Sequence, residues 1–102
     1  MPMKQQLVDD TLTIFLDGEI NSYSADEYEA EIEEILDKYE PKNLIVDMKD
    51  LFYMSSAGIR IVMKLNQRFR NNLLLDNVPN AVYDVLAMVG LDKILKINRL
   101  EK

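Results

Sequence analysis

The sequence contains no cysteine, histidine or tryptophan, and it has only three glycines and three prolines among its 102 residues. Without cysteine and histidine the chain lacks the thiolate and imidazole groups that hold zinc, and it can form no disulfide. The same absence removes a cysteine nucleophile and the histidine base of a serine triad. We therefore expect no metal or cofactor site and none of the enzyme classes that depend on these side chains.

Basic residues are also scarce, with 12 lysines and arginines against 18 acids and a net charge of -6. This charge argues against nucleic acid as a partner, because neutralisation of phosphates dominates sequence-independent binding to a duplex. The apolar run at residues 85–89 is the longest, and the first six residues do not resemble a signal peptide. We expect one compact domain over residues 1–102, with no membrane partner and a cytoplasmic location.

The charge is distributed unevenly along the chain. Residues 26–40 hold eight acids and a single lysine, whereas residues 56–70 carry four basic side chains and no acid. Three interpretations stay open: attraction between the two segments in the fold, surfaces of opposite sign that face different partners, or two ordinary solvated helix faces.

The first forty residues predict a β-hairpin followed by a helix. Apolar residues at 7–8 and 12–16 flank two aspartates, which is typical of a hairpin, and Gly18 is expected to end its second strand. Residues 24–27, Ser-Ala-Asp-Glu, match a capping box, so a helix should begin there and end near Pro41. Its apolar stripe comprises Tyr28, Ile32, Ile35, Leu36 and Tyr39. On the opposite side we expect exposed carboxylates at Glu27, Glu31 and Glu34.

The remaining residues predict alternating strands and helices. Residues 44–46 are apolar without alternation, which favours a central strand covered on both faces, and residues 73–75 predict another buried strand. Between them, residues 56–70 predict a helix that buries Gly58, Ile61, Val62, Leu65 and Phe69.

The C-terminal part predicts a third helix after Pro79, with Val82, Val85, Leu86 and Val89 on its apolar face. Gly90 should end it in a left-handed conformation with positive φ. Residues 93–97 indicate a short edge strand or a helical turn. The order of elements predicts a single α/β domain, with a mixed, mostly parallel sheet, an N-terminal hairpin and about three to four helices.

Two adjacent serines, Ser55 and Ser56, stand where the second helix should begin. A phosphate at such a position would meet free backbone amides and the positive end of the helix dipole. The position suits a phosphoacceptor serine, but on generic grounds it favours an ordinary N-cap.

Residues 53–60, Tyr-Met-Ser-Ser-Ala-Gly-Ile-Arg, resemble the signature of the STAS domain, the anti-sigma factor antagonist family of bacterial partner-switching systems. That signature is a hydrophobic pair, Asp-Ser-Ser-Gly and an apolar residue. Alignment on Gly58 assigns the phosphorylatable serine to Ser56. Further segments that look like family motifs follow in the expected order at residues 18–21, 44–48, 78–82 and 89–93.

Four positions depart from the family pattern. Ser55 stands where the family has an acid, and Ala57 replaces the serine after the acceptor. Arg60 replaces a second glycine, and Asn21 replaces the aspartate of the Gly-Glu-Leu-Asp turn.

The resemblance implies a regulatory protein that is not itself an enzyme. In such systems the unphosphorylated antagonist binds an anti-sigma factor that is also a serine protein kinase, and this binding releases the sigma factor. Phosphorylation of the acceptor, here Ser56, blocks binding, and a metal-dependent serine phosphatase restores it.

A partner surface is expected around Ser56. Ile59 and Met63 fall outside the predicted core stripe and are candidate partner contacts, or they pack against a neighbouring helix. Gly58, which lacks a Cβ, is expected to let a partner backbone approach closely. The complete predicted partner-binding set is Asn21, Ser55, Ala57, Gly58, Ile59, Arg60 and Met63.

Two other interpretations remain. In one, the chain is a non-phosphorylated scaffold of the STAS type that controls a non-transcriptional output, and Ser56 only caps its helix. In the other, a small nucleotide-binding or hydrolytic enzyme uses Ser56 as a nucleophile. The enzyme is disfavoured because only Asp47, Lys49 and Asp50 are near in sequence as bases, and no phosphate-binding G-x-x-x-x-G-K-[ST] loop is present.

Overall fold

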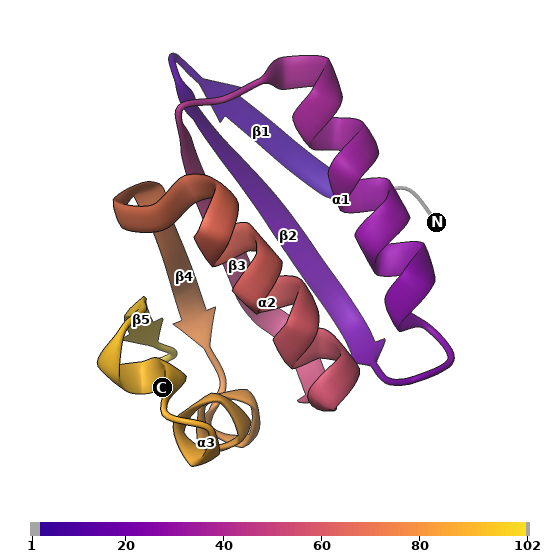
Figure 1. Ribbon diagram of the computed structural model, residues 1–102, viewed down its shortest axis with the longest axis vertical. Coiled ribbons are helices and arrows are strands. Elements are labelled where there is room, and N and C mark those ends of the chain that lie inside the picture. Colours follow the sequence, from indigo (N-terminus) through magenta and orange to yellow (C-terminus); the bar gives the residue numbers. More distant parts are fainter. Residues whose placement is uncertain (1–2, 102) are drawn as a thin grey trace.

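The computed structural model describes residues 3–101, which form a five-stranded sheet in the order β1-β2-β3-β4-β5 (Figure 1). The strands are β1 Lys4–Val8, β2 Thr11–Ile20, β3 Asn43–Met54, β4 Leu73–Val78 and β5 Lys96–Arg99. β1 pairs with β2 in the antiparallel sense, and the other three pairings are parallel. The predicted mixed sheet with its N-terminal hairpin is therefore confirmed, and β3 lies at the centre.

The helices are α1 Ala25–Tyr39, α2 Ser56–Phe69 and α3 Asn80–Met88, with short 3₁₀ turns at η1 Arg70–Asn72 and η2 Leu91–Lys93. Figure 1 shows α1 and α2 side by side on the same face of the sheet. The C-terminal tail was predicted to form a short edge strand or a helical turn, and it contains both, as β5 and η2. No helix in residues 3–101 combines the length and apolar character needed to span a bilayer.

The core lies between the sheet and the two long helices. All five residues of the predicted face of α2 are buried, as are Ile32, Ile35 and Leu36 of α1. In β3, Leu44 and Val46 are buried whereas Ile45 between them is only partly buried. The expectation that this strand is covered on both faces is therefore wrong. Its apolar run continues onto the less covered face because Ile45 lies among half-buried neighbours such as Thr13 and Leu74.

Gly18 does not end β2, which continues to Ile20 and corrects the predicted boundary. Gly18 adopts φ +88, and the pairing of β2 with β3 shifts in register between Gly18 and Glu19. A residue in the left-handed region lets one strand absorb an irregularity without leaving the sheet. The glycine therefore marks a bulge inside the strand.

The helix α1 begins where predicted, but its capping box does not form. Ser24 is the N-cap, and its side chain caps no amide of the helix. Its hydroxyl instead donates to the carbonyl of Glu19 at 2.9 Å and accepts from the amide of Asn21 at 3.0 Å. Hydrogen bonds to Asn21 and to Glu19 near the end of β2 have thus replaced the bond to the amide of Glu27 that the sequence pattern predicts.

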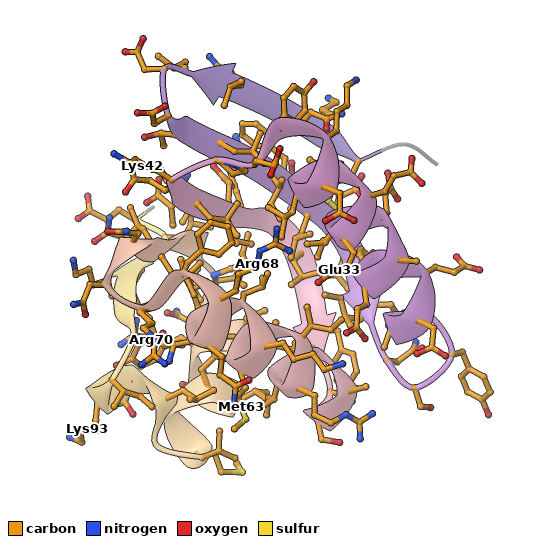
Figure 2. The ribbon with its side chains drawn as sticks, turned by 45° about the horizontal axis from the view of Figure 1, so that its top comes forward. Glu33, Lys42, Met63, Arg68, Arg70 and Lys93 are labelled. Atoms are coloured by element: carbon orange, nitrogen blue, oxygen red, sulfur yellow. The ribbon has the colours of Figure 1, made fainter. Side chains whose placement is uncertain are left out.

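The acidic and basic segments attract each other across the α1–α2 seam. Lys64 Nζ lies 2.6 Å from Glu29, and Arg68 lies 3.3 Å from Glu33 and 3.9 Å from Asp37. Figure 2 shows Arg68 and Glu33 in the seam between the two helices. These side chains are partly solvated, so each pair contributes at most about 1 kcal/mol. Charge complementarity within the fold therefore accounts for much of the uneven distribution.

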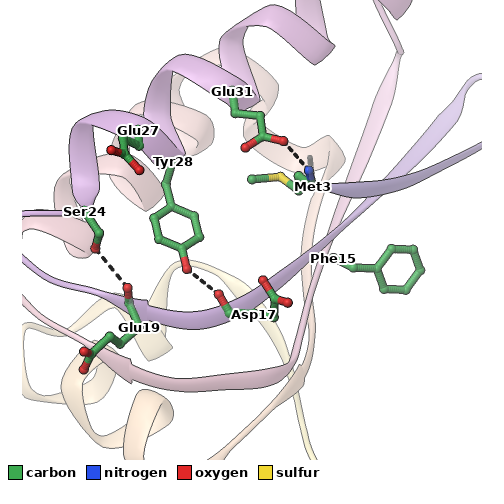
Figure 3. A pocket seen from close by; sticks show the side chains of 8 residues that line it. All are labelled: Met3, Phe15, Asp17, Glu19, Ser24, Glu27, Tyr28 and Glu31. Atoms are coloured by element: carbon green, nitrogen blue, oxygen red, sulfur yellow. Dashed lines mark hydrogen bonds between the residues drawn. The ribbon is translucent and has the colours of Figure 1, made fainter. Parts of the chain in front are cut away.

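Glu27 and Glu34 of α1 are exposed as expected, but Glu31 is partly buried. Its carboxylate accepts a hydrogen bond from the backbone amide of Met3 (Figure 3). The expectation of three equally solvated acids is wrong for Glu31, because the residue before β1 packs against the same side of α1. Helical periodicity alone cannot reveal a contact made by a distant segment.

Truncation of Glu31 should therefore cost more than truncation of a solvated acid on the same helix. We expect Glu31→Ala to lower the free energy of unfolding by about 1 kcal/mol, because the amide of Met3 loses its acceptor. Glu34→Ala is the matched control and should stay within about 0.5 kcal/mol of the wild type. Urea unfolding measures both, and equal losses would contradict the role of Glu31.

Gly90 follows the C-cap of α3 and has φ +82, which confirms its predicted left-handed conformation. We expect Gly90→Ala to destabilise the protein by about 1 kcal/mol, owing to backbone strain alone. Steric overlap is not involved, because a Cβ there would meet no heavy atom within 4 Å. Gly90→Asn should lose less, since asparagine tolerates this region better. Equal stability of Gly90→Ala and wild type in thermal unfolding would refute the strain.

Candidate functional site

The candidate site lies where the parallel strands β2 and β3 end. The carboxyl ends of adjacent parallel strands meet at one edge of a sheet, and here Ile20 is in register with Met54. The amide of Ser55 donates to the carbonyl of Ile20 at 2.8 Å. The loop that begins at Asn21 and the start of α2 are therefore brought together. The motifs at residues 18–21 and 53–60 thus lie side by side in the fold.

Ser55, not Ser56, is the N-cap of α2. Ser55 has an extended backbone, and its hydroxyl accepts a hydrogen bond from the amide of Ala57 at 3.2 Å. Its carbonyl accepts from the amides of Gly58 and Ile59. Ser56 is the first helical residue and is exposed. The ordinary N-cap interpretation of Ser56 is therefore wrong, because its neighbour already performs that function.

Gly58 is buried against the ends of β2 and β3. A Cβ on this residue would lie 2.5 Å from Cγ of Met54 and 3.2 Å from Cγ2 of Ile20. The expectation that Gly58 admits a partner backbone is wrong, since two helical positions rotate it about 200° from the exposed Ser56. Ala57 is also buried, at 6% exposure. Both residues seat α2 on the sheet, and neither presents a side chain to the surface.

The other candidate contacts on α2 differ in exposure. Met63 is 46% exposed and lies on the side of α2 turned away from α1 (Figure 2). Ile59 is only partly buried and packs against the core, in line with the alternative of internal packing. Arg60 is exposed. The accessible surface next to Ser56 thus combines a cationic side chain with an adaptable apolar one.

Asn21 organises the adjacent loop. Its Oδ1 accepts hydrogen bonds from the amides of Tyr23 at 2.8 Å and Ser24 at 3.0 Å. This is the geometry of an Asx-turn, which aspartate and asparagine both form through the same oxygen. The turn directs Tyr23 outward, and its side chain is 93% exposed.

Sequence reasoning missed the exposed aromatic residues around this edge of the sheet. Besides Tyr23, they include Phe52 at 66% and Tyr53 at 47% exposure near the end of β3. Tyr53 pairs with Glu19, just after the register shift that follows Gly18. The Asn-Ser-Tyr-Ser turn is a signal that could have identified Tyr23, because a turn carries its side chains at the surface.

A separate pocket of about 220 Å³ lies between α1 and β2 (Figure 3). Tyr28 lies within it and donates a hydrogen bond to the carbonyl of Asp17. Burial raises the pKa of the Tyr28 hydroxyl, and the carboxylates of Asp17, Glu19 and Glu31 raise it further. Within the described part of the chain, no group of three or more acidic, cysteine or histidine residues is arranged to hold a metal ion. Neither Ser56 nor any residue of the predicted partner-binding set lines this pocket.

The STAS domain family matches residues 3–101, and the chain belongs to that family. BtrV of Bordetella bronchiseptica is 31% identical over 93 residues, which cover 88% of this chain and 79% of BtrV. The anti-sigma-B factor antagonist of Listeria monocytogenes is 29% identical over 99 residues, which cover 90% of this chain and 82% of the relative.

Solved structures share the fold at lower identity. An anti-sigma factor antagonist from Mycobacterium paratuberculosis is 18% identical with a TM-score of 0.82, over 93% of this chain and 82% of that chain. The Bacillus cell fate determinant SpoIIAA in its phosphorylated form is 19% identical with a TM-score of 0.68, over 94% and 90%. Its unphosphorylated form is 20% identical with a TM-score of 0.75, over 94% of this chain and 87% of that chain.

A larger residue at position 58 should damage folding. We expect Gly58→Val to lower the free energy of unfolding by about 1–3 kcal/mol, because the added atoms overlap Met54 in the core. Gln67→Val is the matched control, since it places the same side chain at an exposed position of α2. Its change should stay below about 1 kcal/mol. A fully stable Gly58→Val would contradict the close packing.

Proposed function

We propose that this protein is the antagonist component of a partner-switching system. Its unphosphorylated form binds an anti-sigma factor that is also a serine protein kinase, and the sigma factor is released. Phosphorylation of Ser56 by that kinase blocks binding, and a metal-dependent serine phosphatase reverses the modification. The observation that carries the proposal is the exposure of Ser56 in the first turn of a helix that Ser55 caps.

The relatives support this proposal independently of the geometry. The matched Listeria protein is named an anti-sigma-B factor antagonist, and a structural neighbour with the same fold exists in phosphorylated and unphosphorylated forms. The chain acts as the substrate of the kinase and catalyses no reaction itself. The use of ATP by the kinase implies a cytoplasmic location.

The physical basis of the switch is a change of charge at a contact surface. Phosphorylation adds about -1.5 to -2 charges at neutral pH, and burying such a group at an interface requires its desolvation. A penalty of about 3 kcal/mol would lower the affinity for the partner roughly a hundredfold. Because Ser56 does not cap α2, the modification leaves the hydrogen bond between Ser55 and Ala57 available to hold the helix start.

Incubation with the cognate kinase and ATP, followed by mapping of the phosphorylated residue, tests the assignment. We expect phosphate on Ser56 in the wild type and in Ser55→Asn, which keeps an N-cap side chain but removes the neighbouring hydroxyl. Ser56→Ala should accept no phosphate and should bind the kinase constitutively. Ser56→Asp should bind more weakly than wild type, although one carboxylate imitates a phosphate dianion poorly.

Two outcomes would overturn the proposal. Phosphate on Ser55 alone would move the acceptor to the capping residue. No phosphate on either serine, with a kinase that modifies a control substrate, would favour a non-switched scaffold of the same fold.

A further inference from the structure

The basic ridge of α2 consists of Arg60, Lys64 and Arg68, which follow one another at intervals of four residues. Lys64 and Arg68 are engaged by carboxylates of α1. Over residues 3–101, no carboxylate oxygen lies within 4.0 Å of the Arg60 guanidinium. Arg60 is also exposed, so it is the member of the ridge that is available to another anion.

Arg60 lies one helical turn after Ser56. Side chains four residues apart on a helix are neighbours, with their Cβ atoms about 5–6 Å apart. Because Cα–Cβ bonds in a helix tilt toward its N-terminus, the side chain of Arg60 extends over the turn that carries Ser56. Ser56 and Arg60 are both exposed, and no part of the core separates them.

We propose that Arg60 binds the phosphate of phosphorylated Ser56 within the same chain. This inference rests on the proposed function of Ser56 and adds a regulatory role for a second residue. A guanidinium presents a planar fork of donors that matches two phosphate oxygens, and such charge-assisted bonds are stronger than neutral ones. The i to i+4 spacing supplies the geometry for this pair.

The pair changes how phosphorylation acts on the partner surface. In the unphosphorylated form, the guanidinium of Arg60 faces solvent next to Met63 and is available to an acidic group of the partner. Phosphorylation adds an anion and at the same time withdraws this cation into an intrachain contact. One modification therefore alters two features that a partner would recognise, and the phosphate is held in a defined position.

Lys64 cannot readily perform the same function. It lies two turns from Ser56, and its Nζ is already 2.6 Å from the carboxylate of Glu29. Two helical turns correspond to a rise of about 11 Å, which exceeds the reach of a lysine that is held on α1. The chemistry therefore favours Arg60 over the other cations of the ridge.

A double-mutant cycle tests the pair without any kinase. The full chain is prepared with genetically encoded phosphoserine or with serine at position 56, and each form is combined with Arg60→Gln. We expect phosphorylation to shift the unfolding temperature of Arg60→Gln downward, relative to its effect on the wild type, by about 3 °C or more. Arg60→Lys, which keeps the charge but loses the fork, should give an intermediate shift.

Lys42→Gln is the matched control, because Lys42 is an exposed cation that precedes β3, at the other end of that strand from Ser55 (Figure 2). It should leave the effect of phosphorylation unchanged. The difference between Arg60→Gln and wild type should shrink in about 1 M salt, where the Debye length is only about 3 Å. As a direct readout, the Arg60 Nε–H resonance should shift when Ser56 is phosphorylated.

Equal phosphorylation effects in wild type and Arg60→Gln, with an unchanged Arg60 resonance, would overturn the inference. Because phosphoserine is installed directly, that result would leave the kinase reaction untouched. Conversely, a coupled pair in a protein that its kinase never modifies would sustain the inference and refute the proposed function.

Discussion

The parallel pairing of β2 and β3 is the constraint on which the candidate site depends. It brings the carboxyl ends of two strands to the same edge, and the hydrogen bond from Ser55 to Ile20 joins the segments that follow them. The Asx-turn at Asn21 and the first turn of α2 then lie together although more than thirty residues separate them in the chain. The surface around Ser56 is thus a product of sheet topology as much as of the local motif.

The seating of α2 on this edge depends on a close approach at Gly58. Met54 and Ile20 occupy the space that a side chain at position 58 would need, so the helix can lie directly against the strand ends. Lys64 and Arg68 of the basic ridge then face α1 and form ion pairs with its acids. Packing fixes the position of the helix, and the ion pairs add a modest, solvent-screened contribution.

The sequence patterns predicted the elements well because hydrophobic periodicity is a local property that burial enforces along each helix and strand. They predicted the surroundings of individual side chains less well. Gly58 was expected both to lie on the buried face of its helix and to admit a partner backbone, and the atoms of Met54 and Ile20 packed around it leave no room for the second role. Glu31 shows the limit of local patterns, because its hydrogen-bond donor, the amide of Met3, is distant in the chain. Ser24 differs, because its hydroxyl bonds nearby backbone groups of Glu19 and Asn21, which compete with the helix amide that a capping box would use. The left-handed backbone conformation of Gly90 depends on the few residues around the helix end, so it was predictable from the local sequence.

The division of labour between Ser55 and Ser56 has a consequence for how such a chain can evolve. The hydroxyl that holds the helix start belongs to Ser55, and Gly58 is restricted by the atoms packed around it. Position 56 is exposed and carries neither of these structural duties, so it can be exchanged with little effect on folding. Under the proposed function, recognition at this residue could therefore be gained, lost or retuned by mutation while the scaffold stays intact, and selection on signalling could proceed almost independently of selection on stability.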